Sequence, residues 1–256
     1  MDNITTESGR VFETTAFQLR IIAIFAMIMD HSYKIAGIGG EFMTIIGRLA
    51  FPIFAFQIAE GYAYTKDFKS YLKKLLFFAI ISEIPFNITS PFGAIFDPFH
   101  QNVLWTFLIG LIVLRVIDII KNNNKSNILI AIQIVLVSMI GYFVGNILAV
   151  DYSGIGVLTI VVFSLTRNCR YKYIMQLVAF AVLNSLLLGH SIPVNIFGLM
   201  IAIPIQLFAL FALIPIWLYK GKQGYYSKNW SRFCYWFYPV HLIVLFLVTY
   251  FGHSFF

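Results

Sequence analysis

An acid and an imidazole stand side by side inside an apolar run, since Asp30 and His31 interrupt the segment IFAMIMDHSYKIAG at positions 24–37. Arg48 and Glu83 interrupt two later apolar runs. A neutral imidazole can take a proton from an attacking hydroxyl or amine. A carboxylate can orient that imidazole, and a guanidinium can stabilise an oxyanion. Together, these residue types indicate an acyl-transfer site.

The elements that carry these residues are predicted from composition. Of the 256 residues, 60% are hydrophobic and 11% are charged, against about 25% charged in soluble domains. Apolar runs of about 20 residues recur without strand-like alternation, so we predict an all-α polytopic membrane helix bundle. A polar segment, 1–16, precedes a single transmembrane domain, 17–256. The nine predicted transmembrane helices are 17–36, 42–64, 71–87, 102–120, 127–150, 154–166, 172–190, 193–219 and 234–252.

Charge predicts the orientation of the bundle. Loops rich in Lys and Arg alternate with loops nearly free of them, which places 15 of the 18 basic residues on one side. The positive-inside rule makes that side cytoplasmic, with the N-terminus inside and the C-terminus extracytoplasmic. The net charge of +7 follows from this rule and does not indicate nucleic acid. Cys169 and Cys234 show neither a disulfide framework nor zinc spacing, so no metal is expected.

Residue counting sorts the buried charges by depth. A helix rises about 1.5 Å per residue, which places His31 and Arg48 about 20 Å and Glu83 about 18 Å from the cytoplasmic side. Together with Asp30 they form one predicted layer in the outer half of the membrane. A second layer, nearer the cytoplasm, is predicted to hold Glu60, Arg115, Asp118, Tyr238 and His241.

Some of these charges also have a purely structural interpretation. Asp30 and Arg48 can form a buried ion pair that only fixes helix packing. Arg115 and Asp118 are three residues apart on one helix and can pair with each other. Charged groups in a bilayer are costly, so such pairing is expected whether or not the residues take part in chemistry.

Other polar residues stand alone. Glu60 lies near the cytoplasmic end of its span and can simply be hydrated, and His241 can be a packing histidine. His100 and His253 lie in outer segments and receive no role. The motif AVDYSGIGV has two interpretations. It can form a tight turn between two helices with Asp151 as an N-cap, or it can form an acceptor site on the outer face.

His31 differs from these residues in its spacing from Arg20. Eleven steps at 100° turn a helix by about 1100°, which leaves a remainder of about 20°, so Arg20 and His31 share one helix face about 16 Å apart. A cation at the cytoplasmic mouth and a base deeper on the same line suit a long donor that is anionic at one end. Acetyl coenzyme A has this shape.

Six blocks occur in order along the chain: LRIIAIFAMIMDHSY, IIGRLAFPIFAFQIAEGYAYT, ISEIPFNI, NVLWTFLIGL, AVDYSGIGVLTI and FYPVHLIVL. These blocks resemble the TraX family, and the Arg20–His31 spacing is similar to the first-helix Arg and His of the acyltransferase-3 membrane enzymes. TraX-like proteins are associated with N-terminal acetylation of conjugative pilin. Acyltransferase-3 enzymes move acyl groups from a cytoplasmic donor to acceptors reached from the other side, often surface glycans.

This resemblance implies that His31 is the catalytic base or, alternatively, an acyl-carrying nucleophile. Glu83 or Asp151 could orient it, and Arg48 or Asn102 could stabilise the oxyanion; Ser82 also falls in a matching block. The predicted catalytic residues are His31, Glu83, Arg48 and Asp30. The predicted donor-binding residues are Arg20, Glu60, Arg115, Tyr238 and His241. The predicted acceptor-binding residues are Asn102, Asp151 and Tyr152.

The function expected from these residues is acyl transfer from acetyl-CoA to an amine or hydroxyl of a pilin or surface polymer, in a bacterial cell membrane. A proton-coupled transporter or flippase also fits layered buried charges, although the prolines show no paired symmetry. A non-catalytic assembly factor is the third class. The sequence sets neither the acceptor nor an oligomeric state.

Overall fold

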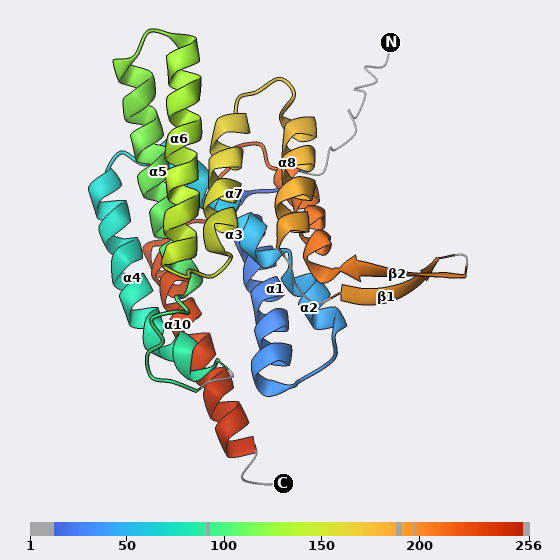
Figure 1. Cartoon of the computed structure of the whole chain (residues 1–256). Coiled ribbons are helices and arrows are strands. Elements are labelled where there is room, and N and C mark those ends of the chain that lie inside the picture. Colours follow the sequence, from blue (N-terminus) through green and yellow to red (C-terminus); the bar gives the residue numbers. More distant parts are fainter. Residues whose placement is uncertain (1–12, 91–92, 188–190, 197, 253–256) are drawn as a thin grey trace, which may run out of the picture.

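The computed structural model describes residues 13–90, 93–187, 191–196 and 198–252. Within these residues the chain forms a helix bundle from which one β-hairpin projects (Figure 1). The helices are α1 (Ala16–Ala36), α2 (Phe42–Gly47), α3 (Ala50–Tyr64), α4 (Phe68–Ile88), α5 (Val103–Asn123), α6 (Asn127–Ile147), α7 (Ser153–Thr166), α8 (Lys172–Leu186), the 3₁₀ helix η1 (Ile205–Ala212), α9 (Leu213–Trp217) and α10 (Lys228–Gly252).

Local signals fix both ends of α1. Thr15 and Gln18 form a reciprocal capping box at its start, which satisfies backbone N–H groups that have no partner inside the helix. Gly37 ends the helix in the left-handed region, with φ at +64°, and its N–H reaches back to the carbonyl oxygens of Ser32 and Tyr33. The helix predicted over 17–36 is therefore present, with its start shifted by one residue.

Most other predicted spans also coincide with helices. The span 42–64 is one apolar segment whose helix is interrupted at Arg48 and Leu49, which separate α2 from α3. The spans 71–87, 102–120, 127–150, 154–166 and 172–190 correspond to α4 to α8, with ends shifted by zero to four residues. The last helix starts at Lys228, six residues before the predicted 234.

The predicted helix 193–219 is wrong over its first half. Strands β1 (Ser191–Ile196) and β2 (Leu199–Pro204) pair antiparallel there, and helical structure resumes only at Ile205. Pro193 and Pro204 lack the backbone N–H that a helix interior needs, and Gly198 has φ at +87°, which suits a turn. Hydropathy alone cannot separate such a run of β-branched residues from a helix.

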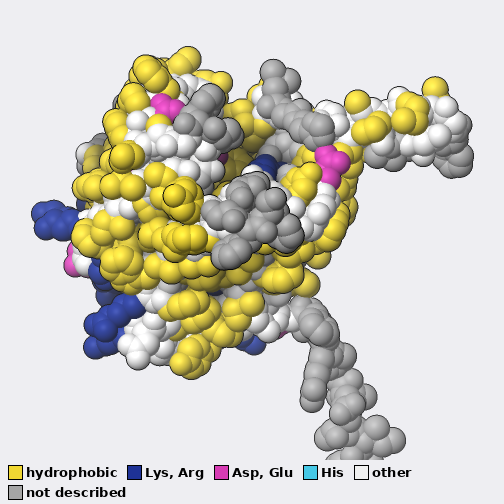
Figure 2. Space-filling model, turned by 90° about the horizontal axis from the view of Figure 1, so that it is seen from below, with side chains coloured by type: hydrophobic (Ala, Val, Ile, Leu, Met, Phe, Trp, Pro, Cys, Tyr) yellow, Lys and Arg dark blue, Asp and Glu magenta, His cyan; other side chains and the backbone are white. Residues whose placement is uncertain are grey.

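Several helices are suited to a bilayer. Four segments of the described chain, Phe42–Tyr64, Val103–Asn123, Asn127–Ile147 and Lys228–Gly252, are long and apolar enough to cross a membrane. Hydrophobic side chains cover most of the end of the molecule seen in Figure 2, and few charged ones interrupt them. The composition and these helices identify a membrane protein.

Small residues bring α6 close to α7. The buried residues of α6 are Ser138, Gly141 and Gly145, whose spacing leaves a narrow strip for close approach. A Cβ added at Gly145 would lie 2.9 Å from the Cα of Gly154 on α7. The rest of α6 presents mostly exposed apolar side chains, as a lipid-facing helix does.

The loops that carry Lys and Arg gather at one end of the bundle, where the α5–α6 and α7–α8 connections lie (Figure 1). The start of α1 lies against another basic loop, because the N–H of Ala16 donates to the carbonyl of Lys222. Of the predicted polar segment 1–16, residues 1–12, which include Arg10, lie outside the described residues, as does His253.

Candidate active site

Two imidazoles meet between α1 and α10. The Nδ1 atom of His31 lies 2.7 Å from Nε2 of His241, and the two rings stack with centroids 5.0 Å apart and planes 5° apart. His241 is buried, with 8% of its surface exposed. On its other side, His241 Nδ1 lies 2.9 Å from the carbonyl oxygen of Phe237, one turn earlier on α10.

These contacts assign the protons of both rings. A carbonyl oxygen only accepts, so His241 carries its proton on Nδ1 and donates it to Phe237. In a neutral ring, Nε2 of His241 is then an acceptor, and it must accept from the Nδ1–H of His31. His31 is left with an unprotonated Nε2. The arrangement presents a base at that single atom and orients its ring.

His31 lines a cavity of about 690 Å³ between the helices, here called the inner cavity. His241 does not line this cavity, but its Nε2 atom contacts Nδ1 of His31. Five of the predicted site residues besides His31 line the inner cavity, from α1 and from three other parts of the chain. They are Asp30, Arg48, Asp151, Tyr152 and Tyr238.

Asp30 and Arg48 form the predicted ion pair. Arg48 Nη2 lies 2.8 Å from each carboxylate oxygen of Asp30, and Lys34 Nζ lies 2.9 Å from Oδ2. Arg48 Nη1 donates to Gln206 at 3.1 Å and Nε donates to the Thr44 carbonyl at 3.3 Å. An arginine has five N–H donors, so this network leaves one hydrogen on Nη1 for the cavity.

Glu83 and Asn102 lie elsewhere. Glu83 accepts hydrogen bonds from Asn102 Nδ2 and, at 2.8 Å, from Trp105 Nε1, so it faces α5. Neither Glu83 nor Asn102 lines the inner cavity. The carboxylate of Glu83 is thus held by α5, and the contacts that the structure gives for His31 do not include it. His241 contacts Nδ1 of His31 instead.

Asp151 and Tyr152 lie in the turn before α7. The N-cap of α7 is Tyr152, with φ at +62° and no side-chain cap, so Asp151 is not the predicted N-cap. Asp151 Oδ1 instead accepts the Tyr152 N–H at 3.0 Å, and burial raises the pKa of this carboxyl above its ordinary value. The Tyr152 ring stacks on Phe51 with centroids 3.8 Å apart. The predicted turn is present, and both residues also face the site.

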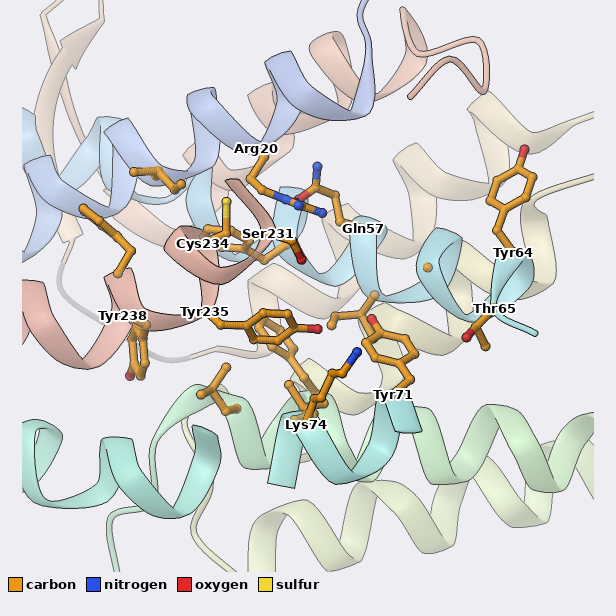
Figure 3. Close-up of a pocket in the computed structure, with 18 of the residues that line it drawn as sticks. Arg20, Gln57, Tyr64, Thr65, Tyr71, Lys74, Ser231, Cys234, Tyr235 and Tyr238 are labelled. Carbon is orange, nitrogen blue, oxygen red and sulfur yellow. The ribbon is translucent and has the colours of Figure 1, made fainter. Parts of the chain in front are cut away.

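A second cavity, of about 600 Å³, lies toward the end of the bundle that carries the basic loops; we name it the mouth cavity (Figure 3). Arg20 and Lys74 bring positive charge to it from α1 and α4. Arg20 Nε donates to Gln57 at 3.4 Å. Tyr71 and Tyr235 extend into the space between them (Figure 3).

The two cavities share a wall. Five residues line both, contributed by α1, α3, α5 and α10, and they are Met27, Phe54, Val103, Phe107 and Tyr238. On α1, Arg20, Met27 and His31 are spaced by seven and four residues, so they follow one helix face from the mouth cavity to the inner cavity.

The remaining predicted donor-binding residues do not line the mouth cavity. Glu60 pairs with Arg167 at 2.6 Å, beside a third cavity of about 280 Å³. Arg115 lies 5.7 Å from the ring centroid of Phe68. His241 belongs with His31. Of the set predicted from the sequence, the structure brings Arg20 and Tyr238 to the mouth cavity.

Comparison with known proteins places the chain in a family. A family model described as TraX protein matches residues 16–249, which include α1 to α10 almost entirely. The chain belongs to the TraX family. The resemblance seen in the sequence blocks is thereby confirmed.

One curated relative is also similar. It is the probable fimbrial assembly protein FimC, serogroup H1, from Dichelobacter nodosus, which is 33% identical over 118 residues. The match covers 42% of this chain and 48% of the relative, so the chain spans about half the length of the curated protein that it matches. No solved structure shows a significant match.

Proposed function

We propose that this TraX-family membrane protein is an acyltransferase that moves an acetyl group from cytoplasmic acetyl-CoA to an amine or hydroxyl acceptor reached from the other side. The observation that carries the proposal is the His31–His241 pair. In this pair the lone pair of His31 Nε2 is left without a partner among the described residues, and His31 lines a cavity that shares a wall with a second, cationic cavity. A buried base beside a route for a long anionic donor suits acyl transfer.

The donor fits the mouth cavity in charge and shape. Arg20 and Lys74 would hold the phosphate groups of the nucleotide, because charge-assisted hydrogen bonds to phosphate are among the strongest available. The apolar and aromatic remainder of the cavity would hold the thin thioester arm. The Lys and Arg residues in the loops at this end predict that it faces the cytoplasm.

The chemistry follows from the free Nε2 of His31. The acceptor nitrogen or oxygen attacks the thioester carbonyl carbon while Nε2 takes its proton. The remaining N–H of Arg48 Nη1 would stabilise the oxyanion of the tetrahedral intermediate. The intermediate collapses, the carbon–sulfur bond breaks, and the proton on Nε2 passes to the departing thiolate. The products are the acylated acceptor and free coenzyme A.

The acceptor enters the inner cavity from the end opposite the basic loops, where Asp151 and Tyr152 lie. The similarity to a protein named for fimbrial assembly, together with the TraX family, supports a pilin subunit or another surface polymer as the acceptor. In this proposal the protein is a multi-pass component of the bacterial cell membrane that modifies a cell-surface component.

A thiol-release assay tests the proposal. Purified protein in nanodiscs is mixed with acetyl-CoA carrying a labelled acetyl group, and free thiol and transferred label are followed for wild type, His31→Ala and Ser32→Ala. Ser32 is the neighbouring residue on α1 and lines neither cavity, so it is the matched control. We expect loss of about 10²–10⁴-fold in His31→Ala, the usual contribution of a general base, and wild-type rates in the control.

Two results would contradict the proposal. Full activity of a folded His31→Ala protein would show that His31 is not the general base. A folded wild-type protein that releases no thiol would favour a transporter or a non-catalytic assembly factor.

A further inference from the structure

The wall shared by the two cavities is almost wholly apolar; three of its residues are buried, and Phe54 and Val103 are half-buried. Tyr238 is 7% exposed, Met27 is 8% exposed and Phe107 is 4% exposed. Tyr238 lies at one extreme of the mouth cavity, far from Thr65 and Tyr64 at the other (Figure 3). A ligand anchored at Arg20 must pass this wall to touch His31, because the wall residues are those that line both cavities.

We infer that Met27, Phe54 and Tyr238 frame a passage through which the thioester arm of the donor crosses from the mouth cavity to the inner cavity. This inference rests on the proposed function and adds the path of the donor to it. The nucleotide end stays at Arg20 and Lys74, and only the uncharged arm enters the passage.

The chemistry of the wall favours such an arm. A narrow apolar constriction is poorly wetted, so it blocks water and small ions while an uncharged chain can fill it. A donor arm in the passage would meet the side chains of α1, α3 and α10 along its length. Excluding water there also protects the thioester from hydrolysis before an acceptor arrives.

The geometry of the helices sets the length of the path. Arg20 and His31 are eleven residues apart on one face of α1, a rise of about 16 Å. Met27 stands between them on that face. On α10, Cys234 lines the mouth cavity and Tyr238, one turn later, lines both cavities. The two helices pack against each other, so their matched faces form opposite sides of one route.

Two cysteine reporters test whether the donor crosses the passage. The native Cys234 reports on the mouth cavity in a Cys169→Ser background. A second protein carries Ile35→Cys with both native cysteines changed to Ser, and it reports on the inner cavity one turn from His31. The rate of modification by a small methanethiosulfonate reagent is measured with and without S-methyl coenzyme A, a thioether that does not react with the reagent, in nanodiscs.

S-methyl coenzyme A should slow modification at both reporters at least tenfold. Met27→Trp, which fills the passage, should abolish protection at Ile35→Cys and leave protection of Cys234 in place. Met27→Leu, which keeps an apolar side chain of similar size, is the control and should keep protection at both reporters.

Each result decides the inference. Protection of Cys234 alone in the wild-type wall would overturn the passage and leave donor binding intact. Protection at neither position would also overturn it. Protection at both positions that Met27→Trp does not change would place the route elsewhere. Protection as expected in a protein that releases no thiol would keep the passage and refute the proposed transfer reaction.

Discussion

Replacing His241 by Phe isolates what the second imidazole contributes. The substitution keeps a flat ring that can stack on Phe237 and His31 but removes the acceptor that holds the Nδ1–H of His31. One neutral hydrogen bond contributes about 0.5–1.5 kcal/mol. At about 1.4 kcal/mol per factor of ten, kcat should fall about two- to thirteen-fold, far less than in His31→Ala.

A second variant of His241 distinguishes a role in orienting His31 from a role in packing alone. In His241→Gln the side-chain amide can reach the position of the lost Nε2 and accept from His31, so we expect most of the rate to return. The assay is single-turnover thiol release from acetyl-CoA in nanodiscs, with unfolding midpoints measured for each variant. A Phe variant as inactive as His31→Ala, or one as active as wild type, would refute the role of His241 as a positioning residue.

Three further predictions concern the surroundings of this pair. Asp30→Ala leaves Arg48 buried without its carboxylate, which should destabilise the protein by about 3–5 kcal/mol. The double variant Asp30→Leu with Arg48→Met should recover much of this loss. Chemical unfolding in detergent measures the stability of both variants, and equal losses of stability would contradict the pairing. Gly47→Ala should disturb the same pair, because its Cβ would lie 2.3 Å from Asp30 Cβ; the expected result is a lower unfolding midpoint and reduced thiol release. Lys222 lowers the pKa of Glu13 through a hydrogen bond and its charge. The stabilisation from this ion pair is therefore complete above the ordinary Glu pKa of about 4.3 and is lost as the pH falls through the lowered pKa. A carbon NMR titration of Glu13 should show the lowered pKa, and Lys222→Gln should return it to about 4.3.

Much of the fold could be predicted because hydropathy and caps act locally. The apolar runs give the approximate extents of α1 and of α4 to α8. Side-chain caps also mark the starts of α1, α4, α5 and α6, at Thr15, Asp67, Asn102 and Ser126. The hairpin Ser191–Pro204 could not be recognised in this way, since an apolar run rich in β-branched residues fits a strand or a helix equally well. Its prolines were the available signal.

Neither the depth of His241 nor the direction of Glu83 could be predicted for the site. The prediction places His241 near the cytoplasm because it starts the last span at 234. The helix starts at Lys228, and the six extra residues add about 9 Å, which brings His241 level with His31. Glu83 accepts from Trp105 on α5, since the rotation of a helix depends on neighbours that one sequence does not specify.

The His31–His241 contact joins residues 210 positions apart, on the first and last helices that the structure describes. A ribosome adding about 5–20 residues per second takes about 10–40 s to travel between them. During that interval the nascent chain already holds the imidazole proposed as the base but lacks the ring that orients it. In the proposed reaction, the base gains its orienting partner only once the last helix has inserted and docked on the first.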